Sequence, residues 1–188
     1  MFNNKKAIKR VLTAFITLTV TYFAIIAYMV ASAGPSFDSQ PAHEMTAKEI
    51  DDLGFEQRYQ SQSAHFIMRD SSKLTAQHFI NDSDLSVVIL HGILSSSYTN
   101  NRFAGLIREA ANAEVYSLDL RGHGASDGSP GDVSYIGQYV DDVADVVEQI
   151  KKSKPTGRII IAGHSMGGGI SLRYAMKEGL PDIDGYLL

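Results

Sequence analysis

Short apolar runs alternate with amphipathic segments along the second half of the chain. The runs cover residues 86–90, 113–118 and 158–162, and each leads into a turn that contains glycine or charged residues. Apolar runs of this length are typical of strands buried on both faces of a parallel sheet. Between and after them, the patterns of residues 101–111, 134–152 and 166–177 predict helices. In the second of these, one stripe is apolar and the acidic residues lie mostly off it; the stripe comprises Ile136, Val140, Val143, Val147 and Ile150, and the acids are Asp141, Asp142, Asp145 and Glu148.

Two further strands are predicted before this alternation and one after it. Residues 65–69 and 75–80 read as a hairpin around the polar turn 70–73, and residues 184–188 begin another strand. A hairpin followed by β-α-β-α-β-α-β predicts an α/β fold with a mostly parallel sheet. We expect this domain to cover residues 60–188, and we expect residues 34–59 to form a linker with a short helix at 46–53. Ligands of such sheets bind at the carboxyl ends of the strands.

The N-terminus carries a membrane signal. Residues 1–10 form a basic segment, followed by a stretch without charge from Val11 to Phe37. Its apolar centre, residues 11–31, measures about 31 Å as a helix, enough to cross the hydrocarbon core. We therefore predict a single-pass signal anchor at residues 11–33, with the basic segment in the cytoplasm and the remainder exported to the periplasmic or extracellular side.

Cleavage is the competing interpretation of this segment. Ala31-Ser32-Ala33 fits an A-x-A cleavage site, which would release a secreted protein after cleavage near Ala33. The apolar region, at roughly 20 residues, is longer than the 7–15 of a signal peptide, which favours the anchor.

Composition excludes several classes of function. The 188 residues carry a net charge of −4 and no cysteine. A basic surface for nucleic acid is absent from the sequence beyond its N-terminus, so we expect no nucleic-acid partner. Disulfides, thiol catalysis and cysteine zinc sites are excluded, and no pair of histidines or carboxylates has the spacing of metal ligands. We expect no metal and no cofactor.

The most distinctive motif is Gly163-His164-Ser165-Met166-Gly167-Gly168, placed directly after an apolar strand. A G-x-S-x-G pattern between a strand and a helix predicts a nucleophile elbow, in which the serine stands at the tip of a tight turn. A dinucleotide site requires G-x-G-x-x-G, and its middle glycine is Ser165 here, so that alternative fails. A phosphate-binding P-loop fails as well, because no Lys-Ser or Lys-Thr follows the glycines. A chance match to a short pattern is the remaining alternative.

Two other loops follow parallel strands. In 91–95, a glycine-containing turn is placed to aim the backbone N–H of Ile93 at an oxyanion, together with that of Met166 after the nucleophile. A plain strand-end turn is the alternative for this loop. In 119–127, we expect structural roles for Asp119, Arg121 and His123, with Arg121 paired to Asp119 or Asp127. We expect His164 to be packed inside the elbow.

These motifs resemble the α/β-hydrolase superfamily, in particular its monoacylglycerol lipase, lysophospholipase and serine aminopeptidase-like group. The matching stretches are Phe66–Asp70, Val88–Gly92, Leu118–Gly128 and Ala162–Gly168, within residues 60–188. The resemblance implies that Ser165 is the nucleophile and that the Ile93 and Met166 amides form the oxyanion hole. It implies hydrolysis of a carboxylic ester, or less often of an amide, without a cofactor.

The sequence departs from this group after the elbow. The group continues through further strands, a cap, an acid loop and a histidine loop, whereas here all six histidines precede Ser165. Of the later acids, Glu178, Asp182 and Asp184, none matches the group's acid position. His91 and His123 do not sit where the group's base approaches the serine. We therefore expect an N-terminal part or truncated product, reaching the start of the sixth strand, with negligible activity as the 188-residue chain.

Three functions are compatible with these observations. The first is a membrane-anchored serine hydrolase that acts on small hydrophobic or lipid-derived esters through an acyl-enzyme on Ser165, with amide hydrolysis as its variant. The second is a non-catalytic remnant or binding protein that keeps the pocket. The third is a membrane-tethered structural protein, which the four ordered loop motifs argue against.

Overall fold

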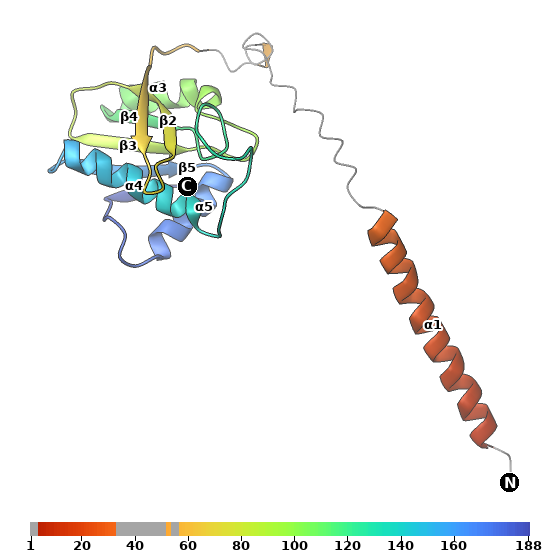
Figure 1. The fold of residues 1–188 in the computed structure, drawn as a ribbon. Helices are drawn as coiled ribbons and strands as arrows, with labels where there is room; N and C mark the ends of the chain where they lie inside the picture. Colours follow the sequence, from red (N-terminus) through yellow and green to blue (C-terminus); the bar gives the residue numbers. More distant parts are fainter. Residues whose placement is uncertain (1–3, 33–51, 54–56) are drawn as a thin grey trace. The chain divides into compact units, whose positions relative to one another are not determined.

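The computed structural model describes residues 4–32, 52–53 and 57–188 (Figure 1). The chain divides into two compact units, Met1–Glu44 and Met45–Leu188, and each is considered by itself. Most of the linker predicted at 34–59, and most of the short helix predicted at 46–53, lie outside the described residues. The Ala31-Ser32-Ala33 cleavage site lies partly outside them.

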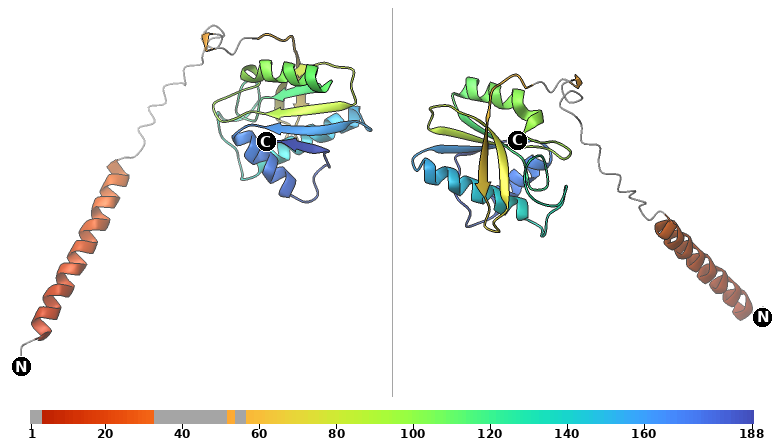
Figure 2. Two further views of the ribbon diagram at one scale, coloured as in Figure 1. Left: turned by 180° about the vertical axis from the view of Figure 1, so that it is seen from behind. Right: turned by 45° about the horizontal axis from the view of Figure 1, so that its top comes forward.

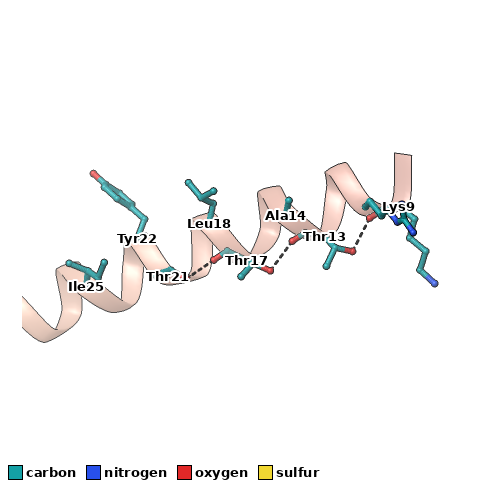
Figure 3. A pocket seen from close by; sticks show the side chains of 9 residues that line it. Lys9, Thr13, Ala14, Thr17, Leu18, Thr21, Tyr22 and Ile25 are labelled. Carbon is teal, nitrogen blue, oxygen red and sulfur yellow. Dashed lines mark hydrogen bonds between the residues drawn. The ribbon is translucent and has the colours of Figure 1, made fainter. Parts of the chain in front are cut away.

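The first unit contains one long helix, α1 (Asn4–Ser32). Its residues Lys9–Met29 are long and apolar enough to cross a membrane, with a mean hydropathy of 2.0. A signal sequence near the N-terminus has the same properties, so the helix is a candidate span. The hydroxyls of Thr13, Thr17 and Thr21 each donate a hydrogen bond to the carbonyl four residues earlier (Figure 3). This bonding lowers the cost of placing threonines in an apolar environment. The hollow drawn in Figure 3 is lined by α1 alone.

The second unit contains a six-stranded sheet. Its strands are β1 (Gln62–Ile67), β2 (Lys73–Phe79), β3 (Leu85–Leu90), β4 (Glu114–Leu118), β5 (Arg158–Gly163) and β6 (Gly185–Leu187). They lie in the order β1-β2-β4-β3-β5-β6. The β1–β2 and β2–β4 pairs are antiparallel, and the β4–β3, β3–β5 and β5–β6 pairs are parallel. The predicted α/β fold with a mostly parallel sheet is confirmed.

Helices cover both faces of this sheet (Figure 2). On one face, α3 (Asn101–Ala111) follows the short 3-10 turn η1 (Tyr98–Asn100) and packs through Ala104 and Ile107. On the other, α4 (Gln138–Ser153) and α5 (Met166–Met176) bury a larger apolar cluster. Strands β3, β4 and β5 are therefore covered on both sides, which explains why their sequences are uninterrupted apolar runs.

The prediction for the α4 region was wrong in two respects. The helix begins at Gln138 rather than at residue 134, because Gly137 adopts a φ of 106°, and Ile136 before it is 86% exposed. The acids Asp141, Asp142 and Asp145 were placed mostly off the buried stripe, yet all three are buried.

Candidate active site

Ser165 lies at the turn between a central strand and a helix. Strand β5 ends at Gly163 and α5 begins at Met166, so the serine occupies the N-cap position. Its φ of 52° and ψ of −112° place it in a strained region of backbone space. The predicted strand–turn–helix around Ser165 is confirmed.

Two glycines permit this turn. A methyl group on Gly163 would lie 2.5 Å from the carbonyl oxygen of Gly167 and equally close to the Ser171 hydroxyl, and one on Gly167 would overlap the carbonyl of Leu90. Backbone atoms make up most of these contacts, so a side chain has no room at either position. The spacing of glycines two residues before and two residues after the serine therefore has a steric cause.

The loop after β3 lies against the elbow. Leu90 pairs with Leu118 on one side and with Gly163 on the other, so the loops that follow β3, β4 and β5 leave the sheet at one edge. A methyl group on Gly92 would lie 3.3 Å from Cβ of Ser165. The amide of Gly167 donates to the carbonyls of His91 and His164.

The backbone amides of Ile93 and Met166 are the two candidate oxyanion donors. Within the described part of the chain, neither donates to a protein acceptor. The Ile93 amide directly follows Gly92 in the sequence, and the Met166 amide directly follows Ser165. Both amides are thus free of a protein acceptor among the described residues, and both belong to loops that meet at the elbow.

His91 is fully buried and links two loops. Its Nε2 accepts a hydrogen bond from the Leu120 amide at 3.0 Å, so the proton resides on Nδ1, which donates to the Gly92 carbonyl at 2.7 Å. Burial lowers the pKa of His91 below its usual value and keeps the ring neutral. With both nitrogens bonded to backbone, His91 has none free to accept a proton from Ser165.

Asp119 ties the same two loops together at a second point. One carboxylate oxygen accepts the Ser97 amide at 2.6 Å and the other accepts the Ala125 amide at 3.0 Å. The ring of His123, which donates through Nδ1 to the Arg121 carbonyl, packs edge-on against His91. The contacts of these residues are therefore those of a structural loop.

The partners predicted for Arg121 were wrong. Its guanidinium forms ion pairs with Asp142 at 2.7 Å and with Asp70 at 2.9 Å, not with Asp119 or Asp127. Hydrogen bonding to Arg121 lowers the pKa of Asp70 to about 2. Burial raises the pKa of Asp142, and the Arg121 guanidinium opposes this shift.

His164 also differs from expectation. The ring was expected to be packed inside the elbow, but the residue is exposed, with Nδ1 bordering Gly92.

Other features of the site have no local sequence signal. The bonds from His91 to Leu120 and from Asp119 to Ser97 join residues more than 20 positions apart. Leu94, in the loop after β3, adopts a φ of 57°, which no sequence pattern predicts for a leucine. Among the described residues, no group of three or more potential metal ligands is found.

A family model agrees with this geometry. The model described as serine aminopeptidase, S33, matches residues 81–188, from the segment just before β3 to residue 188. The chain belongs to this family of α/β hydrolases. The match contains the loop after β3, the loop after β4 and the elbow.

Curated relatives of this S33 chain include two lipases. A monoacylglycerol lipase of Mycolicibacterium smegmatis is 35% identical over 91 residues, which are 48% of this chain and 32% of the lipase. A monoglyceride lipase of Mus musculus is 43% identical over 64 residues, which are 34% of this chain and 21% of that protein. The chain thus spans about a third of the length of the curated relatives it matches.

A solved structure supports the fold of the S33 chain. An esterase of Pyrococcus furiosus superposes with a TM-score of 0.57 at 24% identity, covering 73% of this chain and 49% of the esterase. At that identity the likeness establishes the α/β-hydrolase fold alone.

Proposed function

We propose that this chain carries the nucleophile and oxyanion hole of a serine hydrolase that cleaves carboxylic esters of hydrophobic, lipid-derived acids. The observation that carries the proposal is the elbow, where Ser165 is strained and exposed, is followed directly by the Met166 amide, and contacts Gly92, the residue before Ile93. The names of the two lipases among its relatives support an ester of a lipid acid as the substrate.

The proposed reaction proceeds through an acyl-enzyme. Oγ of Ser165 forms a bond to the acyl carbon, the carbonyl oxygen becomes an oxyanion, and the Ile93 and Met166 amides stabilise its charge. The oxyanion then collapses, the alkoxide leaves and takes up the serine proton, and water later attacks the acyl carbon to release the acid and restore Ser165.

The base of this reaction is not assigned among the described residues. In this fold the histidine follows the nucleophile along the chain, and the six histidines of this sequence all precede it. His91 is excluded by its two backbone bonds. Loss of a triad member lowers rates by about 10⁴- to 10⁶-fold, so we expect near-background turnover from the 188-residue polypeptide.

Amide hydrolysis is the second candidate, since the matching family model is that of a serine aminopeptidase. Esters and amides share the same acyl-enzyme and oxyanion. The two are separated by comparing acylation of Ser165 by p-nitrophenyl butyrate with acylation by alanine p-nitroanilide, each detected as the acyl-serine by mass spectrometry.

The nucleophile is tested independently of turnover. The full chain in lipid nanodiscs is treated with an alkyl fluorophosphonate, which forms an Oγ–P bond with a reactive serine as fluoride leaves, and the modified residue is mapped by mass spectrometry. We expect slow modification confined to Ser165, absent from Ser165→Ala and unchanged in Ser153→Ala, at the remote end of α4. Modification of another serine at an equal rate would contradict the assignment, and a chain with no modification at all would favour a non-catalytic binding protein.

A further inference from the structure

Leu94 has an unusual backbone conformation for a leucine. Among the described residues, the non-glycine positions with positive φ are Ser71, Leu94, Asn112 and Ser165. Asparagine tolerates this region, and Ser165 is held there by the elbow. Leu94 is the single apolar residue in the set, and a branched side chain in the left-handed region is strained.

Among the described residues, the side chain of Leu94 finds no burial to offset that strain. It is 94% exposed, and the neighbouring Ile93 is 67% exposed. A glycine at residue 94 would relieve the backbone strain and remove apolar surface from water. Among the described residues, this side chain is therefore left available to contact a ligand.

The loop that presents Leu94 is held at both ends. His91 donates to the Gly92 carbonyl at one end, and Asp119 accepts the Ser97 amide at the other. Between them, the Ser95 hydroxyl bonds to that of Thr99 at 2.5 Å. These anchors impose the conformation of the loop, so the projection of Leu94 is built into the fold.

This projecting side chain belongs to the loop that contacts Ser165. Gly92 is in contact distance of Ser165, since a methyl group on it would meet Cβ at 3.3 Å. Two further residues along a chain advance by at most about 7 Å. Leu94 thus lies within reach of the substituent on a carbonyl carbon bound at the serine.

We propose that Leu94 is a specificity-determining residue whose side chain packs on the acyl chain of the bound ester, so that medium-length acyl groups are preferred over acetyl. The proposal rests on the proposed function of Ser165. Leu94 and Ile93 together offer an apolar surface without any charge, which suits an alkyl chain and offers no partner to a charged acyl group.

The test measures chain-length preference in binding, without turnover. Trifluoromethyl ketones with a decyl and an ethyl chain are titrated against the full chain in nanodiscs, with ¹⁹F NMR reporting the bound ligand. Their ketone carbon accepts Oγ of Ser165, and the serine proton passes to solvent as the oxygen becomes an oxyanion. The variants are Leu94→Asn, which tolerates positive φ and is of similar size, and Leu106→Asn, a half-exposed leucine on α3. All variants are held in nanodiscs of the same lipid, so partition of the decyl ketone into that lipid is the same for each and cancels when the variants are compared.

We expect the decyl-to-ethyl ratio of affinities to fall roughly tenfold in Leu94→Asn, which corresponds to about two methylenes of lost contact, and to stay unchanged in Leu106→Asn. An unchanged ratio in Leu94→Asn overturns the proposal and leaves the proposed function intact, provided that Ser165→Ala abolishes ketone binding. If Ser165→Ala binds both ketones as tightly as the native chain, the proposed function fails and this proposal with it. Leu94→Gly, which relieves the backbone strain, replaces Leu94→Asn under the same criteria if the latter does not fold.

Discussion

At the scale of single residues, the turn at Ser165 requires Gly163 and Gly167 for steric reasons but does not require Gly169. A methyl on Gly167 would overlap the Leu90 carbonyl, and one on Gly163 would meet the Gly167 carbonyl, whereas Gly169 has no atom within 4 Å of that position. The elbow motif and the helix after it are therefore glycine-rich for different reasons.

We predict that Gly167→Ala destabilises the protein by about 2–4 kcal/mol, because two backbone segments must separate to admit the methyl group. The matched control is Gly169→Ala inside α5, where the same change is expected to stabilise by about 0.5–1 kcal/mol through helix propensity. Urea unfolding of the full chain followed by circular dichroism measures both. Equal effects of the two substitutions would contradict the steric reading of the elbow.

His91 gives the stability of the fold a pH dependence. Its folded pKa is lowered, chiefly by burial and further by the nearby His123, while the Gly92 carbonyl and Asp119 oppose the shift. A group with a depressed folded pKa contributes stability that is present above its unfolded pKa and lost as the pH falls through the folded pKa. Protonation at Nε2 also breaks the bond from the Leu120 amide.

We therefore predict that the free energy of unfolding falls as the pH is lowered from about 6.5 through the depressed folded pKa. His91→Asn, which does not titrate, is expected to be less stable at pH 7 and to lose this part of the pH dependence. The measurement is urea unfolding between pH 4 and 8, with His65→Asn on the edge strand β1 as control. A pH profile of His91→Asn parallel to that of the native chain would show that another group is responsible.

At the scale of elements, charged side chains join the β1–β2 turn and the loop after β4 to helix α4. Arg69 pairs with Asp145 and Asp141, Arg121 pairs with Asp70 and Asp142, and Lys177 pairs with Asp141. These contacts explain how three aspartates are buried on a helix that also packs against the apolar core.

Removal of the Arg121 charge tests this cluster. We predict that Arg121→Met destabilises the protein by about 3–5 kcal/mol, because the side chain of Asp142 is only 3% exposed and would be left without its partner. The double variant Arg121→Met/Asp142→Leu is expected to recover most of this loss. The control is Glu148→Gln, which breaks an exposed pair with Lys152 and is expected to change stability by less than about 1 kcal/mol. If the destabilisation of the double variant equals the sum of the two single effects, Arg121 and Asp142 do not act as a pair.

The sequence predicted the order and type of the elements well, because each buried strand of the parallel sheet is a continuous apolar run. The helix at 101–111 has the predicted bounds, and the strands at 86–90 and 158–162 differ from theirs by one residue. The start of α4 was predicted wrongly because the apolar periodicity extends N-terminally to Ile136. The positive φ of Gly137 prevents the helix from beginning before Gln138. The burial of Asp142 was missed because its partner, Arg121, lies 21 positions away and leaves no periodic trace.

In the candidate site, too, features set by local sequence were predictable and features set by distant contacts were not. Ser165 and its glycines form one short motif, so the strand–turn–helix was predictable from local sequence. The contacts of His91 and the positive φ of Leu94 depend on loops brought together by the sheet, and no spacing within the chain encodes them. The catalytic roles of Ser165, Ile93 and Met166 stay predictions until the labelling experiment is done.

At the scale of the whole molecule, α1 is a candidate membrane span or signal sequence, and its orientation and processing would set the compartment of the second unit. The helix contains an uncharged apolar stretch, and basic residues precede that stretch in the sequence. Its threonine hydroxyls are satisfied by the helix itself, so they do not prevent insertion. We infer that α1 is an uncleaved anchor with the domain on the exported side, because basic flanks remain in the cytoplasm.

We predict that the full chain resists extraction from membranes by alkaline carbonate and retains its original N-terminus. An alkaline phosphatase fused after Leu188 is expected to be active, since this reporter matures only after export. Reversal of the four basic residues Lys5, Lys6, Lys9 and Arg10 to glutamate is expected to lower the exported fraction, because positive charge sets orientation. The control is the same number of reversals in the second unit, at the exposed Lys73, Arg102 and Lys152 and the half-buried Lys151, which are expected to leave orientation unchanged. A mature protein that begins at Gly34 and is soluble after export would show instead that the segment is a cleaved signal peptide.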